Sequence, residues 1–521
     1  MLQWLFGKSK ESVPAKRKLS PQEESRRMAG CKQVVLEYAD ALGFIARESI
    51  TRDELEKLIN EGIDPDDLSR EIRRRIDEKP GIILGDYHYA NGQTQIKIPH
   101  SLRDRHTYII GKSGSGKTNL IRLMAMQDID IGHGIGMLAP EQELITEEIL
   151  PYIPEERIDD VVYFNPANMQ SPIPLNPLYL DDDADIDLCV DDNLTIFKRL
   201  MGETQVRMDE ILRQSLYALL AHPGSTLLDV EKLLSPTDDS FRKEIINASQ
   251  DEQTRYFFEK TYPYFPKDAH LPITTRINRL VRPRAVRNLL CQPGKSFNFR
   301  EAMDEGKILL FNLSDGILGE QTSQLLGQMI VSKIQLATMS RMDTPAANRR
   351  PFYLYLDEFQ TFTGVAETSY EKMLSRARKY RLSLILAHQQ TGQLPKTLLD
   401  EIFGNVTTFI TFSVAYADAM RLSQQYIVTM GAEKKPLPTE EFVSQRVGNA
   451  IGKIDQTVFK LSMPLAPQQP NHKRANYIIE RSAKNYGLHA YSRKLWEATV
   501  QHQEPKQLTG GSERPDPEQV F

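Results

Sequence analysis

The sequence predicts an α/β protein with a largely parallel sheet, an all-α insertion and a small helical N-terminal region. From Arg105 onward, short apolar runs alternate with helical stretches, and runs that are apolar throughout are typical of strands buried on both faces of a parallel sheet. Residues 185–300 lack such runs, and their apolar residues recur at helical spacing, which predicts the all-α insertion. The predicted strands are Thr107–Ile110, Ile135–Leu138, Val161–Phe164, Ile308–Leu313, Phe352–Leu356, Leu382–Ala387 and Thr407–Phe412.

Composition places the chain among globular proteins with a sizeable core, since 40% of its 521 residues are hydrophobic and 26% are charged. The formal charge of −5 neither favours nor excludes a nucleic-acid partner, because a basic channel can be offset by acidic surface elsewhere. The three cysteines are far apart and predict no disulfide framework. No run reaches the ~18 apolar residues of a membrane-spanning helix. We therefore expect a cytoplasmic protein with at most peripheral contact with the inner face of the cell membrane.

Helical and strand patterns divide the chain into five parts. Residues 1–80 are predicted to form the helical N-terminal region, in which Ser20 and Thr51 each begin a capping-box sequence. Residues 81–184 and 301–465 are the two parts of the α/β domain, and residues 185–300 are the insertion between them. Residues 466–521 are predicted to contain a C-terminal helix and a disordered tail.

A phosphate-binding loop is predicted at Gly111–Thr118, which matches the pattern G-x-x-x-x-G-K-[ST]. An apolar run precedes the loop and an amphipathic helical stretch follows it, as the motif requires. The backbone N–H groups of such a loop surround phosphate oxygens, Lys117 reaches the β and γ phosphates, and the Thr118 hydroxyl binds Mg²⁺. The predicted nucleotide-binding residues are Gly111, Lys112, Ser113, Gly114, Ser115, Gly116, Lys117, Thr118 and Asn119.

Two acids follow the apolar run Phe352–Leu356, and they supply the second half of a P-loop site. Asp357 is placed to hold Mg²⁺, and Glu358 is placed to polarise an attacking water. Considered alone, the pair could equally be a solvated acidic turn, but the P-loop favours the catalytic interpretation. No Asn-Lys-x-Asp motif for guanine is present, so we predict ATP and Mg²⁺ as the cofactors.

A polar amide ends the next predicted strand. In many ATPases an amide at this place senses the γ-phosphate, and Gln389 is our candidate, with Gln390 second. The alternative is a turn amide that bonds its own loop. We expect the neighbouring His388 to pack in the protein rather than to act in catalysis.

The order of several short motifs resembles the HerA–FtsK superfamily, and most of all the TraD/TraG-like coupling proteins of type IV secretion. The resemblance spans residues 100–465. It implies a RecA-like motor domain with an all-α insertion, assembled as a homo-hexamer that uses ATP to move DNA through a central channel. The motifs are Arg105-His106, Gly111–Thr118, Val161–Pro166, Leu175–Pro177, Leu356–Phe359, Ala377–Tyr380, Ala387–Gln389, Gly404-Asn405 and Asp418-Ala419.

The same resemblance implies an arginine that completes the active site of a neighbouring subunit. Phosphoryl transfer develops negative charge on the γ-phosphate, and ring ATPases commonly neutralise it with an arginine supplied in trans. Arg378 is the leading candidate, Arg105 the second and Arg376 a distant third. The alternative is that Arg378 only braces its own helix against Glu371 or another neighbour.

Two departures from the family pattern keep other functions open. Residues 139–143 read Ala-Pro-Glu-Gln-Glu where the family usually has Asp-Pro-His-Gly-Asp, although Glu141 or Glu143 could replace the lost acid. The expected N-terminal membrane helices are not seen either. A relaxase or a secretion channel is the partner expected of a coupling protein. The alternatives are a HerA-like double-stranded DNA translocase with a nuclease partner, a protein-secretion ATPase that binds no DNA, and a nucleotide-switched scaffold.

Candidate DNA contacts lie in the predicted insertion, where five arginines occur within twelve residues. Arginines three residues apart share one helix face, so a stripe that tracks phosphates is one interpretation. Pro283 interrupts any single helix here, and arginines that brace neighbouring helices are the alternative. The five arginines are Arg276, Arg279, Arg282, Arg284 and Arg287.

Overall fold

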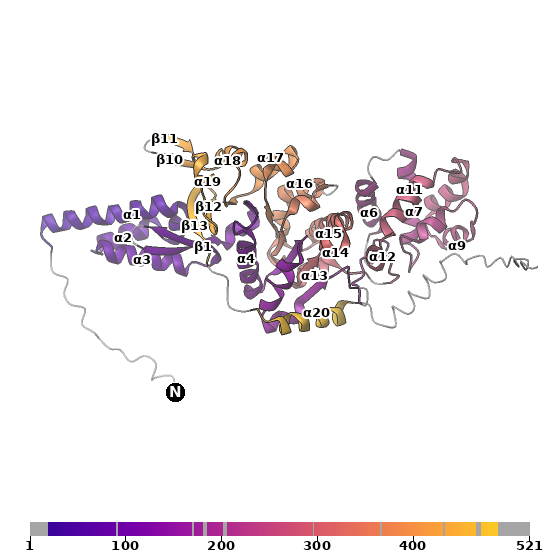
Figure 1. Ribbon diagram of the computed structural model, residues 1–521, viewed down its shortest axis with the longest axis horizontal. Coiled ribbons are helices and arrows are strands. Elements are labelled where there is room, and N and C mark those ends of the chain that lie inside the picture. The colour runs from indigo at the N-terminus through magenta and orange to yellow at the C-terminus, as the bar shows by residue number, and fades with distance from the viewer. Residues whose placement is uncertain are drawn as a thin grey trace, which may run out of the picture.

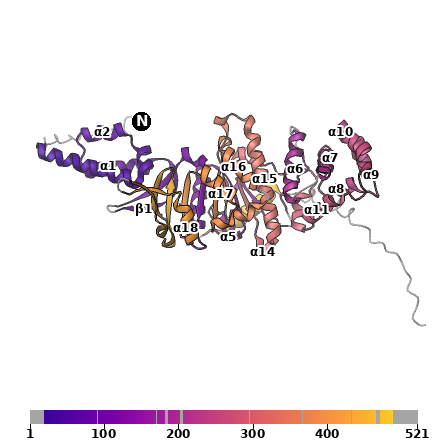
Figure 2. The same ribbon diagram turned by 90° about the horizontal axis from the view of Figure 1, so that it is seen from above.

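The protein is an elongated molecule with three parts along its length, as the computed structural model shows in two perpendicular views (Figures 1 and 2). N-terminal helices lie at one end, a large mixed sheet with flanking helices lies in the middle, and a helical insertion lies at the other end. The structure describes residues 19–89, 92–168, 171–180, 185–201, 206–294, 296–364, 367–430, 433–464 and 470–487.

The central sheet has eleven strands in the order β2-β1-β13-β12-β9-β3-β8-β7-β4-β6-β5. From β9 to β5 all neighbours are parallel, whereas β12, β13, β1 and β2 extend this block by antiparallel pairing. All the predicted strands are present, and the predicted α/β fold class is confirmed. The strands of this sheet are β1 (Gly81–Tyr89), β2 (Gly92–Pro99), β3 (Thr107–Ile110), β4 (Gly134–Ala139), β5 (Val161–Phe164), β6 (Ile308–Asn312), β7 (Phe352–Leu356), β8 (Leu382–His388), β9 (Thr408–Thr411), β12 (Asn449–Ile454) and β13 (Thr457–Ser462).

Helices cover both faces of the parallel block, which explains why its strands are apolar throughout. Along β3, Tyr108 and Ile110 belong to one hydrophobic core and Ile109 to the other. The core around Ile109 includes α4 (Lys117–Ile131), α5 (Gln142–Thr146) and α20 (His472–Tyr486). The core around Tyr108 includes α13 (Phe299–Glu305), α15 (Glu320–Ser340), α16 (Glu367–Arg376) and α17 (Lys396–Asn405).

Smaller elements complete the central part. A two-stranded ribbon is formed by β10 (Ile427–Met430) and β11 (Glu433–Pro436). The remaining short helices are α14 (Asp315–Leu318), α18 (Tyr416–Ser423) and α19 (Thr439–Val443).

The N-terminal helices pack on the antiparallel end of the sheet, and their core is continuous with that around α4 (Figure 1). Thr51 forms the predicted capping box with Glu54, and Ser20 exchanges the same pair of hydrogen bonds with Glu23. The helices are α1 (Pro21–Ser49), α2 (Arg52–Asn60) and α3 (Pro65–Glu78). No helix among the residues that the structure describes is long and apolar enough to cross a membrane.

The described residues of the insertion form helices joined by turns, with no strand among them, and its apolar side chains share the core of α15. Pro283 separates two of its helices, as the missing N–H of proline predicts. The insertion contains α6 (Ile186–Met201), α7 (Val206–Leu220), α8 (Asp229–Leu234), α9 (Ser240–Ala248), α10 (Glu252–Tyr256), α11 (Leu271–Val281) and α12 (Arg284–Leu290).

Candidate nucleotide site

The strand order brings the predicted site residues to one edge of the sheet. The P-loop follows β3, Gln389 follows β8, and Asp357 follows β7. Strand β8 lies between β3 and β7 and is parallel to both. Because the carboxyl ends of neighbouring parallel strands meet at the same edge, the three segments converge at a place where α/β proteins bind ligands.

Glycine is required in the P-loop for its backbone conformation and for close approach. Gly114 and Gly116 have φ angles of +70° and +119°, which side chains with a Cβ rarely adopt. A Cβ on Gly111 would come within 2.6 Å of the Cβ of Phe412. The loop therefore packs tightly against the end of β9.

The loop has free capacity for an anion. The Oγ of Ser115 is buried and has no hydrogen-bond partner in the described part of the chain. The first N–H groups of α4, which begins at Lys117, have no carbonyl partner within their own helix. These groups fit a phosphate, which accepts several hydrogen bonds and is favoured by the positive end of a helix.

Lys117 is buried and points back over the P-loop. Its Nζ donates hydrogen bonds to the carbonyl oxygens of Gly111 at 2.8 Å and of Lys112 at 3.2 Å. Nζ also lies 4.0 Å from Oε1 of Glu358. Burial lowers the pKa of Lys117, while the charge of Glu358 opposes that shift. The ammonium is therefore placed between the loop and the acids of β7.

The remaining predicted loop residues flank this lysine. Thr118, the residue whose hydroxyl is predicted to bind Mg²⁺, lies in the first turn of α4 and is exposed. Asn119 is half-buried, and its Nδ2 donates to the carbonyl oxygen of Pro464 at 3.1 Å. The amide of Asn119 thus anchors α4 to the segment after β13.

Asp357 directly follows β7 and is 8% exposed. Burial raises the pKa of its carboxyl to about 7, and the charge of Glu358 acts in the same direction. Its backbone N–H donates to the carbonyl oxygen of Leu138 on the neighbouring strand β4. A divalent cation beside this carboxyl would favour its ionised form. The position therefore fits the predicted Mg²⁺ ligand.

Glu358 is held by two amides, and one of them was not predicted. Nε2 of Gln389 donates to Oε1 of Glu358 at 2.9 Å, and Nε2 of Gln360 donates to Oε2 at 2.8 Å. Glu358 itself has a φ angle of +45°, which is uncommon for a residue with a side chain. The role of Gln360 was not predicted from the sequence. The sign that could have indicated it is an amide two residues after the acid.

Gln390 and His388 lie outside this contact. Gln390 is exposed and forms a reciprocal cap with Gln393, which is the turn role considered as an alternative. His388 is buried, with its Nε2 2.6 Å from the hydroxyl of Tyr108, and burial lowers its pKa to about 3. Gln389 is thus the amide that reaches the acid of β7, and His388 packs in the core.

The departure from the family pattern at residues 139–143 lies beside the same edge. The charge of Glu141 acts on both Lys117 and Asp357, which places its carboxylate near them. Glu143 lies in α5, where its carbonyl oxygen accepts a hydrogen bond from the N–H of Glu147. Of the two acids considered as replacements, Glu141 is the one that influences the site.

The candidate arginines lie at the opposite edge of the sheet. Arg378 is in the 3-10 turn Ala377–Tyr380 before β8, whereas Gln389 follows the seven residues of that strand. At ~3.3 Å per residue, the strand separates Arg378 from its own nucleotide site by roughly 20 Å. Arg105 precedes β3 and lies at the same far edge. Only a neighbouring subunit could therefore receive either arginine at its γ-phosphate.

Arg378 is available for such a contact. Its side chain is 51% exposed, and its Nε lies 3.4 Å from Oδ2 of Asp104. Its partner is therefore Asp104 rather than Glu371, and the contact is too exposed to contribute much stability. Arg376 is exposed as well, at the end of α16.

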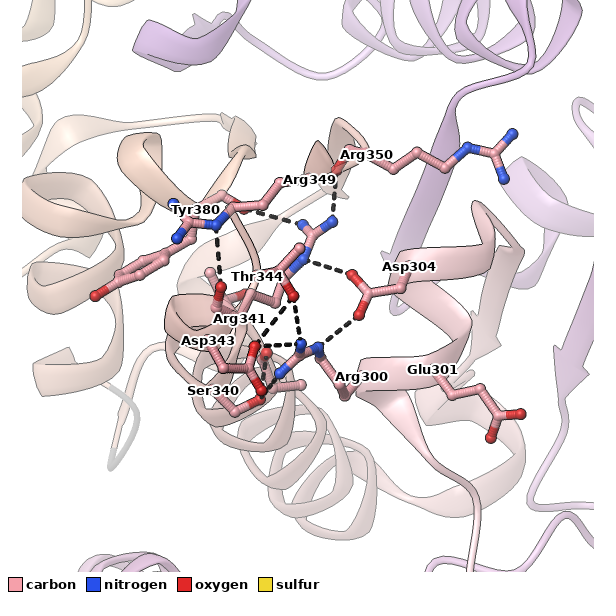
Figure 3. Close-up of polar contacts among 12 residues, drawn as sticks. Arg300, Glu301, Asp304, Ser340, Arg341, Asp343, Thr344, Arg349, Arg350 and Tyr380 are labelled. Carbon is pink, nitrogen blue, oxygen red and sulfur yellow. Dashed lines mark hydrogen bonds and ion pairs between the residues drawn. The ribbon is translucent and has the colours of Figure 1, made fainter. Parts of the chain in front are cut away.

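A buried arginine supports the turn that carries Arg378 (Figure 3). The guanidinium of Arg341 is fully buried and donates to the carbonyl oxygens of Tyr380 at 2.9 Å and of Arg350 at 2.7 Å. It also pairs with Asp304 at 2.8 Å, and Asp304 in turn pairs with Arg300. The ends of α13 and α15 are thereby tied to the starts of β7 and β8.

Comparison with known proteins identifies the fold. The bacterial conjugative coupling protein TrwBdeltaN70, in a trigonal form with sulphate, is 14% identical over 77% of this chain and 94% of that chain, with a TM-score of 0.53. TrwB with the non-hydrolysable ATP analogue ADPNP is 15% identical over 77% and 93%, with a TM-score of 0.52. VirB4 of Thermoanaerobacter pseudethanolicus is 16% identical over 75% and 98%, with a TM-score of 0.50. No protein-family model and no curated protein matches the chain.

The chain thus has the fold of the TrwB and VirB4 structures. The resemblance to type IV secretion coupling proteins, predicted from the motifs, is confirmed at the level of the fold. TrwB has also been solved with ADP and Mg²⁺.

Proposed function

We propose that this protein is a Mg²⁺-dependent ATPase of the type IV secretion coupling-protein type, which moves DNA through a hexameric ring. The observation that carries the ATPase assignment is the convergence of Lys117, Glu358 and Gln389 at the carboxyl ends of three adjacent strands. Each of the three residues follows a different strand, so their proximity depends on the packing of the whole sheet. The TrwB structures with nucleotide, which share this fold, support ATP as the ligand.

Each residue has a defined task in this proposal. The P-loop, residues 111–119, holds the phosphates, and Lys117 places a positive charge at the β and γ phosphates. Thr118 and Asp357 hold Mg²⁺, which neutralises charge on the phosphate oxygens. Glu358 accepts a proton from the attacking water, and Gln389 contacts the γ-phosphate.

Assembly into a ring is proposed because phosphoryl transfer in ring ATPases commonly uses an arginine from a neighbouring subunit. Lys117 is the only cationic side chain that we assign to the γ-phosphate, and Arg378 lies at the far edge of the sheet. A neighbour in a ring would bring its Arg378 to this site. The homo-hexamer expected of the coupling proteins supplies such an arrangement.

A protein-secretion ATPase that binds no DNA is the second candidate. The fold does not separate the two candidates, because the TM-scores for VirB4 and TrwB are nearly equal. The two candidates differ in the substrate that stimulates hydrolysis.

ATP turnover by the 521-residue chain, with and without single- and double-stranded DNA, tests the proposal. Ring formation is checked on the same material by light scattering. We expect hydrolysis that requires Mg²⁺ and rises with DNA. Hydrolysis that DNA leaves unchanged in assembled rings would favour the protein-secretion ATPase, and a lack of hydrolysis would contradict both.

A further inference from the structure

The strongest remaining feature is a basic segment of the insertion, Leu271–Cys291, which comprises α11 and α12. It contains five arginines and no Asp or Glu, in a chain whose formal charge is −5. Arg279, Arg282 and Arg284 are exposed, and Arg276 and Arg287 are half-buried. Positive charge is therefore concentrated on this part of the insertion.

The carboxylate partners that usually neutralise such arginines are absent here. None of the five forms an ion pair with a carboxylate of the residues that the structure describes, and Arg276 instead contacts the Sδ of Met208 at 3.1 Å. The arginines of α3 behave differently, because Arg70, Arg74 and Arg75 all pair with Asp or Glu. Both this segment and α3 are rich in arginine, so arginine content does not distinguish them. They differ in whether their arginines form ion pairs with the described carboxylates.

A cavity of about 410 Å³ lies beside this segment, at the seam between the insertion and the central part. Arg276 and Arg279 line it from α11, and Gln321 and Thr322 line it from the first turn of α15. No acidic side chain of the described residues lines it. Its apolar lining comes from Phe197, Leu280, Pro283 and Leu325.

We infer that this cleft binds the phosphate backbone of the DNA that the proposed motor moves. Arg276 and Arg279 are three residues apart on one helix face, and a guanidinium matches a phosphate with two parallel hydrogen bonds. The amide of Gln321 and the hydroxyl of Thr322 add neutral donors. The volume is in the range of sites that hold one small ligand, such as one nucleotide of a strand.

Nucleic acid fits this chemistry better than an acidic protein segment does. A strand carries one charge at every nucleotide, so it can engage Arg276 and Arg279 in the cleft and then Arg282 and Arg284, which lie on either side of Pro283. The inference rests on the proposed function for the identity of the strand. It adds a contact on the insertion, at a distance from the nucleotide site.

The experiment measures DNA affinity as a function of salt for the wild-type 521-residue chain and for Arg276→Gln combined with Arg279→Gln. Fluorescence anisotropy with labelled single-stranded and duplex oligonucleotides, between roughly 50 and 200 mM KCl, gives the slope of log K against log salt. We expect several-fold weaker binding and a slope smaller by about 1 to 2, because each lost phosphate contact removes close to one released counterion. ATP turnover without DNA should stay unchanged.

The matched control is Arg70→Gln combined with Arg74→Gln, which removes the same charge from paired arginines of α3. Its salt slope should equal that of the wild type. If Arg276→Gln prevents folding, Arg279→Gln with Arg282→Gln tests the proposal through two exposed side chains, of which Arg279 lines the cleft and Arg282 lies next to it in the sequence of the basic segment.

Two outcomes separate this inference from the proposed function. If the wild type neither binds DNA nor is stimulated by it, the proposed function fails and the inference fails with it. If the wild type binds DNA and both cleft variants keep its full salt slope, the DNA contact lies elsewhere and only the inference is wrong.

Discussion

Gln389 donates a hydrogen bond from its Nε2 to Oε1 of Glu358 over 2.9 Å, across two neighbouring strands of the sheet. The other carboxylate oxygen of Glu358 accepts from Gln360. The acid proposed to activate water is thus oriented by one amide from the next strand and by another from its own loop. Orientation of this kind affects the rate of a proton transfer more than the binding of the nucleotide.

Gln360→Ala is expected to lower kcat about tenfold and to leave the KM for ATP nearly unchanged, because it releases one of the two amides that orient the catalytic base. Steady-state ATPase kinetics measure both constants. Gln390→Ala is the matched control, since its side chain caps its own turn, and it should retain wild-type kcat. A rise in KM with unchanged kcat would assign Gln360 to nucleotide binding instead.

Glu358→Gln should bind ATP and Mg²⁺ like the wild type, and its rate of ATP hydrolysis should fall by roughly 10²-fold or more, because the amide keeps the size of the side chain and cannot accept the proton. Binding of a fluorescent ATP analogue and single-turnover hydrolysis measure the two properties. Loss of nucleotide binding would indicate a metal ligand or a structural residue at position 358, and the role of Asp357 would then need revision.

Lys117→Ala should abolish hydrolysis, because the charge on the β and γ phosphates loses its partner. ATP turnover in the presence of DNA measures this most sensitively. The exposed Lys112→Ala, in the same loop, is the control and should retain activity, since it is the carbonyl of Lys112 that contacts Lys117. Normal turnover by Lys117→Ala would remove the P-loop assignment.

Arg378→Ala should retain ATP binding and lose hydrolysis by roughly 10³-fold or more, as expected for an arginine supplied in trans. Mixed rings of Arg378→Ala and Lys117→Ala should recover part of the activity, because an intact P-loop then faces an intact arginine at some interfaces. ATP turnover of such mixtures, with co-assembly verified by pull-down of a tagged subunit, measures this recovery.

Lys379→Ala is the control for that experiment, as a neighbouring exposed cation of the same turn. Full activity of Arg378→Ala rings would eliminate the trans role. Loss of activity in Arg105→Ala alone would transfer that role to the second candidate at the same edge of the sheet.

His106 should make the stability of the protein fall at low pH. Its side chain is 2% exposed and forms hydrogen bonds with the carbonyl oxygen of Leu374 and the N–H of Leu384. Burial lowers its pKa from 6.5 to about 4 in the folded protein. Between these values the unfolded chain binds a proton that the folded chain does not, so stability present above pH 6.5 is lost as the pH falls toward 4.

Urea unfolding of the wild type and of His106→Asn, from pH 7 to pH 4.5, measures this contribution. The variant should be less stable at pH 7, and the difference in unfolding free energy should shrink by at most about 1.4 kcal/mol for each pH unit below 6.5. Asn suits the positive φ angle of 61° at this position. Parallel pH curves for the two proteins would show that His106 titrates alike in both states.

The sequence by itself determined the local features of this protein. A run such as Phe352–Leu356 predicts a buried strand because its apolar pattern is contained within the run, and Gly111–Thr118 predicts a P-loop because its chemistry depends on fixed short spacings. Capping at Thr51 and the break at Pro283 are local for the same reason. In the structure these segments form a buried strand, a loop between β3 and α4, a capping box and a break between two helices.

Only the tertiary structure decided which of these local features meet. Lys117 and Glu358 come within 4.0 Å because β8 is inserted between β3 and β7, and strand order follows from the packing of the whole sheet. The same packing puts Arg378 at the far edge and selects Gln389 over Gln390. The contact of Gln360 with Glu358 depends on a left-handed backbone turn. That Arg276 forms no ion pair with the described carboxylates likewise depends on which helices become neighbours, since contacts between distant segments are set by the fold and leave no short-range pattern.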